Sequence, residues 1–137
     1  VLAERTLVYD IVEQMADYDA GIAHYSTDLK LEGLTAPCPQ AVRVSLLISA
    51  DRDIVAGDIP ELKARYGAVA ADWESGAIAW VTARNGTRCL ILRGVSDLVG
   101  ADGGEAYEGG ITVFYEGARD VMGRLLAHLP AWLAWVG

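Results

Sequence analysis

Residues 70–98 read AADWESGAIAWVTARNGTRCLILRGVSDL, and this stretch decides the expected fold. An acidic cluster at residues 72–74 opens a helical pattern over residues 73–85. The apolar run at residues 87–93 then predicts a buried strand. Because a helix joins this run to the short strand expected at residues 68–71, the two strands should be parallel. The stretch therefore predicts a strand–helix–strand unit of an α/β protein.

Outside this unit, hydrophobic period and turn residues predict the other elements. Asp58 should cap a helix, with Glu61 completing a capping box. The apolar stripe of a long amphipathic helix near the end of the chain should pack in the core. The elements together predict one three-layer α/β/α domain over residues 1–137, with a mixed central sheet. We expect strands at 2–9 and 41–49, a short strand at best at 21–26, a loop at 30–40, helices at 58–67 and 111–129, and a short closing segment at 130–136.

Composition limits the possible partners. The 137 residues include 11 basic and 19 acidic side chains, for a net charge of −8. Such a chain is repelled by the phosphates of nucleic acids and of anionic membranes, so neither is an expected partner. No segment approaches the roughly 20 apolar residues that a membrane-spanning helix needs, and the start of the chain lacks the long apolar run of a signal peptide.

The two cysteines, Cys38 and Cys89, lie far apart and in no metal-binding or redox spacing. We interpret both as reduced packing residues of a cytoplasmic protein, with a disulfide between them as the alternative. The chain begins at Val1, directly in strand-like sequence. A fragment of a longer chain would look like this, although processing would produce the same start.

Two carboxylates carry the functional interpretation. Glu74 lies at the expected helix start, and Asp97 follows the expected strand at 87–93. Either can be explained without a function, Glu74 as compensating the helix dipole and Asp97 as a helix cap. The alternative is a ligand site in which one carboxyl group is a general acid and the other accepts hydrogen bonds from hydroxyls. An aspartate can act as an acid near neutral pH only if burial or a nearby negative charge raises its pKa, and a close Arg93 would oppose this.

Two motifs at this spacing resemble a known family. Residues 72–79, DWESGAIA, and residues 92–98, LRGVSDL, are similar to the helix start (D/E)-M-E-(G/A)-x-A-(I/V)-A and the strand end R-x-(I/V)-S-D of the 5′-methylthioadenosine/S-adenosylhomocysteine nucleosidases. These enzymes belong to the purine nucleoside phosphorylase superfamily. The resemblance extends to the strands expected at 4–9 and 41–49 and to Asp51 beyond them, and so covers most of the chain.

The resemblance implies a reaction and assigns roles to particular residues. An adenine nucleoside is cleaved at its N-glycosidic bond, with Asp97 donating a proton to purine N7 and Glu74 accepting hydrogen bonds from the ribose hydroxyls. Ser96 would help to position Asp97 or the purine, and backbone groups at Asp53 and Ile54 would meet the adenine edge. No metal or organic cofactor is implied. The resemblance also implies a homodimer, with residues 17–29 near its interface.

Three departures from the family pattern affect this interpretation. Trp73 replaces the usual methionine beside the ribose, and Asp53 stands where an aromatic residue usually stacks on the purine. Both changes bear on which nucleoside is bound more than on the class of reaction. Family members also carry an upstream part, with the glutamate that activates water, so the chain corresponds to the C-terminal part of a nucleoside phosphorylase-like domain and should be inactive alone. The alternatives are a phosphorylase that uses phosphate and a non-catalytic nucleoside-binding relative.

Overall fold

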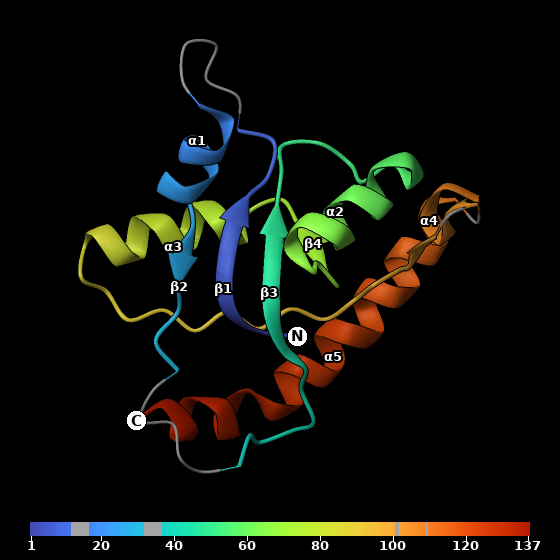
Figure 1. Cartoon of the computed structure of the whole chain (residues 1–137). Helices are drawn as coiled ribbons and strands as arrows, with labels where there is room; N and C mark the ends of the chain where they lie inside the picture. Colours follow the sequence, from blue (N-terminus) through green and yellow to red (C-terminus); the bar gives the residue numbers. More distant parts are fainter. Residues whose placement is uncertain (12–16, 32–36, 101, 109) are drawn as a thin grey trace.

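A mixed four-stranded sheet forms the centre of the molecule (Figure 1). The computed structural model describes residues 1–11, 17–31, 37–100, 102–108 and 110–137. The strand order is β2-β1-β3-β4, in which β1, β3 and β4 run parallel and β2 is an antiparallel edge strand. The mixed α/β class and the two main strands predicted at 2–9 and 41–49 are confirmed. The strands are β1 (Leu2–Val8), β2 (Thr27–Asp28), β3 (Val44–Ser49) and β4 (Ala71–Asp72).

Helices cover both faces of this sheet. Neighbouring residues of a strand point to opposite faces, and in β3 Leu47 and Ile48 belong to two separate core clusters. The Ile48 cluster includes Ile22 of α1 and Leu62 of α2, whereas the Leu47 cluster includes Ala79 of α3. The helices are α1 (Tyr18–His24), α2 (Ile59–Tyr66), α3 (Ser75–Arg84), α4 (Glu105–Glu108) and α5 (Ile111–Val136), with a 3-10 turn at Ala56–Asp58 and a two-stranded hairpin of β5 (Val99–Gly100) and β6 (Gly103–Gly104).

The short strand predicted at residues 21–26 is wrong, because this segment lies mostly in α1. The Asp17 side chain caps that helix by accepting a hydrogen bond from the Asp19 amide, at 3.0 Å. Ile22 is then buried against the sheet. Of the loop predicted at 30–40, residues 32–36 lie outside the described residues.

The buried parallel strand predicted at residues 87–93 is also wrong. A single antiparallel bridge joins Leu92 to Leu2, with the Ala3 amide donating to the Ile91 carbonyl (3.0 Å) and the Arg93 amide donating to the Val1 carbonyl (2.9 Å). The first residues of β1 extend beyond its pairing with β2, which is limited to Arg5 and Thr6. Residues 87–93 therefore cross the first residues of β1 without forming a strand, and we call them the crossing segment. The burial of Ile91 explains the apolar character of this segment.

The capping box predicted for α2 does not form. Asp58 ends a 3-10 turn, makes no capping hydrogen bond and instead pairs with Arg52, at 2.7 Å. The helix still has Pro60 in its first turn, and it ends as predicted at Gly67, which has a left-handed backbone with φ of 63°.

The last helix differs most from its prediction. Helix α5 continues through Pro130 and takes in the segment 130–136. Its predicted core stripe is wrong in large part, because five of the side chains predicted to be buried are exposed: Ile111, Tyr115, Met122, Leu126 and Leu129. The reason is that α5 packs on the segment before Asp97, where Gly94 faces Val121, and not on the sheet. Among the described helices, none has the length and apolarity that a membrane crossing requires.

Candidate functional site

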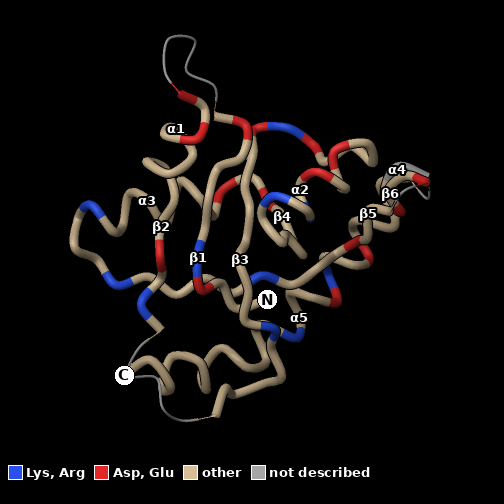
Figure 2. The backbone as a smooth tube through the Cα atoms, in the orientation of Figure 1, with Lys and Arg blue, Asp and Glu red and all other residues tan. Residues whose placement is uncertain are grey.

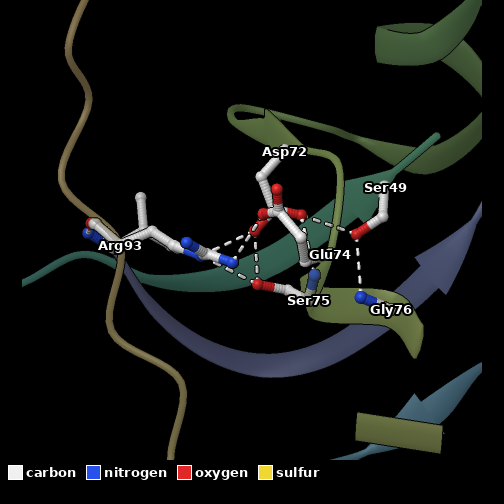
Figure 3. Close-up of polar contacts among 7 residues, drawn as sticks. Ser49, Asp72, Glu74, Ser75, Gly76 and Arg93 are labelled. Carbon is white, nitrogen blue, oxygen red and sulfur yellow. Dashed lines mark hydrogen bonds and ion pairs between the residues drawn. The ribbon is translucent and has the colours of Figure 1, made fainter. Parts of the chain in front are cut away.

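A polar cluster lies where the parallel strands β3 and β4 end and helix α3 begins (Figure 3). Ser49 is the last residue of β3, and Asp72 is the last residue of β4. The Ser49 hydroxyl donates to Asp72 Oδ1 at 2.7 Å and accepts from the Gly76 amide at 2.8 Å. This one side chain therefore joins two strand ends to the start of the helix, at the edge of the sheet where α/β proteins bind their ligands.

Asp72 is held by several donors and has a structural role. Besides Ser49, its carboxylate accepts hydrogen bonds from the Ser75 amide, at 3.1 Å, and from the Ser75 hydroxyl. Its side chain is only 13 % exposed. The prediction of Asp72 as the N-cap residue is wrong, because α3 begins at Ser75, two residues later than expected, and Glu74 holds the N-cap position without a capping hydrogen bond. Asp72 instead accepts the amide of the first helical residue from two positions before the N-cap.

Arg93 connects this structural carboxylate to the exposed one. Its Nε lies 2.6 Å from Asp72 Oδ2 and donates to Ser75 Oγ at 2.9 Å, while its Nη2 donates to Glu74 Oε2 at 3.0 Å. The Glu74 side chain is 55 % exposed. Two carboxylates and one guanidinium leave one negative charge, and the carboxylate still open to a ligand is Glu74.

Asp97 lies four residues beyond Arg93 and outside this hydrogen-bonded cluster. The Ser96 hydroxyl donates to its Oδ1 at 2.6 Å, and both side chains are partly buried. Among the described residues, Asp97 shares no hydrogen bond or ion pair with Glu74 or Arg93. The structure thus brings the two predicted carboxylates onto connected segments, but not into contact, and the guanidinium that we expected to oppose Asp97 pairs with Asp72 and Glu74 instead.

The remaining predicted site residues form no hydrogen bond or ion pair with the cluster in the described part of the chain. Trp73 is 55 % exposed and directly precedes Glu74. Asp53 is exposed and Ile54 partly buried, in the loop after β3. Acidic residues gather on this loop and on the end of β1 (Figure 2), where the Asp51 amide donates to Asp10 Oδ2 at 2.9 Å. Together they make the neighbouring loops negatively charged.

Sequence reasoning missed the two serines of the cluster. Ser49 and Ser75 are both almost fully buried, at 2 % and 1 % exposed. Two signals in the sequence could have indicated them. One hydroxyl lies at the end of an apolar strand and the other lies just after an acidic helix start, and buried hydroxyls at such places need hydrogen-bond partners. Arg93 was named only as a possible neighbour of Asp97, and its bonds to Asp72 and Glu74 were not foreseen.

Neither a metal site nor a disulfide was found in the part of the chain that the structure describes. No group of three or more His, Cys, Asp or Glu side chains there is placed to hold a metal ion. Cys38 and Cys89 are both free and partly buried in the structure.

Comparison with known proteins adds no assignment, because no family model, no curated protein and no solved structure matches the chain. The site is therefore interpreted from its residues and their geometry.

Proposed function

We propose that this protein hydrolyses the N-glycosidic bond of an adenine nucleoside, such as 5′-methylthioadenosine or S-adenosylhomocysteine. In this proposal the mixed sheet belongs to a nucleoside phosphorylase-like fold. The nucleoside lies at the carboxyl ends of β3 and β4, with its ribose at Glu74 and its purine at Asp97.

One observation supports the proposal above the others, the ion pair between Arg93 and Glu74 at 3.0 Å. Glu74 belongs to the motif at residues 72–79, and Arg93 belongs to the motif at 92–98. The two motifs on which the resemblance rests are thus in contact, although Glu74 and Arg93 are separated in the sequence by the whole of α3. A site that needs one residue from each motif requires this proximity.

The geometry around Glu74 suits the binding of a sugar. A carboxylate accepts hydrogen bonds through both of its oxygens, and Arg93 contacts only Oε2. Glu74 can therefore accept hydrogen bonds from neighbouring ribose hydroxyls while Arg93 fixes its orientation. Trp73 offers an exposed apolar surface beside the sugar.

Asp97 supplies the proton that the leaving purine needs. As the bond between ribose C1′ and purine N9 breaks, its electron pair moves to the purine and Asp97 transfers a proton to N7. Water adds to C1′ and gives up one proton to the solvent, from which the Asp97 carboxylate is protonated again. The adenine then leaves as a neutral molecule. Ser96 holds the Asp97 carboxyl group through the 2.6 Å hydrogen bond to Oδ1 and leaves Oδ2 to face the base.

Because the resemblance implies that this chain is inactive alone, the proposal is tested by adenine release from 5′-methylthioadenosine with the full-length protein, measured with and without phosphate. We expect adenine to appear in the absence of phosphate. If release depends on phosphate, the protein is a phosphorylase and the hydrolysis proposed here is wrong. If no purine nucleoside tested releases its base, but one binds in calorimetry, the protein is a nucleoside-binding relative.

A further inference from the structure

Two buried hydroxyl groups bind the Asp72 carboxylate, and they differ in what else they contact. The Ser49 hydroxyl donates to Oδ1 and the Ser75 hydroxyl donates to Oδ2. Ser49 also accepts a hydrogen bond from the Gly76 amide, at 2.8 Å. Ser75 instead accepts one from Arg93 Nε, at 2.9 Å. Ser75 thus lies on the side of the carboxylate that faces Arg93, and Ser49 lies on the other side (Figure 3).

The two partners of the Ser75 hydroxyl fix the direction of its hydrogen. An ionised carboxylate only accepts hydrogen bonds, and a guanidinium only donates them. The Ser75 hydroxyl must therefore donate to Asp72 and present a lone pair to Arg93 Nε. Ser75 is 1 % exposed, so it is shielded from the water that could replace these partners. It holds the guanidinium through a contact for which solvent does not compete.

Arg93 needs such a contact because its ion pair with Glu74 is exposed. The Glu74 side chain is 55 % exposed and the Arg93 side chain is 37 % exposed. Exposed ion pairs contribute little on their own, because holding two long side chains in one geometry costs conformational entropy. The Nε atom, in contrast, contacts the mostly buried groups of Asp72 and Ser75. These groups set the orientation from which Nη2 reaches Glu74, at 3.0 Å.

The two contacts of Arg93 Nε differ in how strongly they depend on angle. Asp72 Oδ2 lies 2.6 Å away and forms an ion pair, whose energy depends mainly on distance. The hydrogen bond to Ser75 Oγ also depends steeply on the angle at the hydrogen. Because the guanidinium is planar, fixing the direction of Nε–H also fixes the direction of Nη2. Ser75 therefore sets the angle at which Arg93 meets Glu74.

We infer that Ser75 is a positioning residue that sets the preference for ribose hydroxyls, by orienting Arg93 and through it Glu74. The inference rests on the proposed function, in which Glu74 accepts hydrogen bonds from the ribose. The family pattern at residues 72–79 has glycine or alanine in place of Ser75, so the resemblance implies no role for this hydroxyl. Because Ser75 is buried, it acts without touching the nucleoside.

Binding of 5′-methylthioadenosine and of its 2′,3′-dideoxy analogue to the full-length protein tests the inference. The dissociation constant of the analogue divided by that of the nucleoside measures the preference for ribose hydroxyls. Ser75→Ala should lower this preference about fivefold, the change expected when one hydrogen bond is lost. Ser49→Ala is the matched control and should keep the preference of the wild type. It removes the other buried hydroxyl from Asp72 and leaves the hydrogen bond between Ser75 and Arg93 in place.

A double substitution tests whether Ser75 acts through Glu74. In a Glu74→Gln background, adding Ser75→Ala should leave the preference unchanged, because the carboxylate that Ser75 positions is already gone. Circular dichroism checks that all the variants are folded. Ser75→Gly, which also lacks the hydroxyl, replaces Ser75→Ala if that variant does not fold.

The outcomes separate the role of Ser75 from the function on which it rests. Equal preferences in Ser75→Ala and Ser49→Ala, or an equal loss of affinity for both ligands, would overturn the role of Ser75 and leave the proposed function standing. A fall that is as large in the Glu74→Gln background would do the same. A wild-type protein that binds neither ligand, or binds both equally well, would overturn the ribose site at Glu74 and the role of Ser75 with it.

Discussion

Arg93 Nε lies 2.6 Å from Asp72 Oδ2, and through this contact a residue of the crossing segment holds the carboxylate that accepts the first amide of α3. The same guanidinium reaches Glu74 with its other nitrogen. The planar fork of arginine suits such double contacts, which a lysine ammonium cannot reproduce. The position of Glu74 therefore depends on Arg93, which lies eighteen residues beyond Ser75 in the sequence. It also depends on the hydrogen bonds around Asp72.

Removing the Asp72 carboxylate should destabilise the fold. Asp72→Ala leaves the buried hydroxyls of Ser49 and Ser75 without their acceptor, and we expect the free energy of unfolding to fall by about 2–3 kcal/mol. Urea unfolding followed by circular dichroism measures this loss. The control is Asp28→Ala, which removes the ion pair of a side chain that is 83 % exposed; its effect should stay within about 0.5 kcal/mol. Equal effects of the two substitutions would contradict the structural role of Asp72.

If Asp97 is the general acid, Asp97→Asn should abolish turnover and preserve binding. The amide keeps the size of the side chain but has no acidic proton, so kcat for an adenine nucleoside should fall at least about 100-fold. Calorimetric titration with the nucleoside should give a dissociation constant close to that of the wild-type protein. Asp102→Asn, in the exposed turn between β5 and β6, is the matched control and should change neither quantity. Unchanged turnover in Asp97→Asn would exclude the assigned role.

Glu74→Gln should weaken recognition of the ribose hydroxyls. Hydrogen bonds to a charged group contribute about 1.5–3 kcal/mol each, so we expect affinity for the nucleoside to fall by about 10-fold or more. An analogue without the 2′ and 3′ hydroxyls provides the comparison, because it cannot make these bonds. The wild-type and variant proteins should bind this analogue with similar affinity. An equal loss with both ligands would show that Glu74 does not read the hydroxyls.

Two glycines should prove necessary where the crossing segment meets α5. A Cβ on Gly94 would lie 1.9 Å from Val121 Cγ1, so Gly94→Ala should lower the free energy of unfolding by about 1–3 kcal/mol. Adding Val121→Ala should restore part of this loss, because it removes the clashing methyl group. A Cβ on Gly117 would lie 2.0 Å from the Ser96 carbonyl oxygen, which is backbone, so no side-chain truncation should rescue Gly117→Ala.

Gly123→Ala is the control for these two glycines. It lies on the same helix with nothing within 4 Å of the added atom. Alanine is the better helix former by about 1 kcal/mol, so this substitution should stabilise the protein. Thermal unfolding of all the variants gives the comparison, and a stable Gly94→Ala would contradict the packing of α5 described here.

The protein should lose stability at alkaline pH through Tyr66. Burial raises the pKa of its phenol from 10.0 to about 12 in the folded chain. The unfolded chain therefore loses this proton at lower pH than the folded one, so the contribution of Tyr66 is complete below pH 10 and is lost as the pH rises towards about 12. Urea midpoints measured across this range should fall less steeply for Tyr66→Phe. Burial also raises the pKa of Tyr9, so part of the decline should remain in the variant.

The two main strands of the sheet could be predicted because they are rich in apolar and β-branched residues. The run ending at Ser49 is an example. The run at 87–93 was assigned to a strand for the same reason, but it is a crossing segment of which only Ile91 is buried. Apolarity predicts burial, and hydrogen-bond partners from other strands decide whether a buried run is a strand. Helix α1 was missed because its seven residues are too few for a clear period, and the capping role of Asp17 was overlooked.

The candidate site could be predicted in residue type but not in pairing. Glu74 and Asp97 were chosen because carboxylates at helix starts and strand ends often face ligands. The path of the chain after α3 decides which carboxylate Arg93 contacts. The spacing of residues in the sequence does not predict this path. The stripe of α5 shows the same limit, since a helical period identifies an apolar face but does not say what covers it.

The network that begins α3 has a further consequence, for the choice between nucleosides and nucleotides. The start of a helix is a common place for phosphate, which binds to its free amides. Here the amides of Ser75 and Gly76 already donate to Asp72 and Ser49. The exposed Glu74 carboxylate adds a negative charge at the same place. A phosphate group brought to this edge of the sheet would find these two amides occupied and an anion beside them, so we expect the proposed site to bind phosphorylated ligands more weakly than nucleosides.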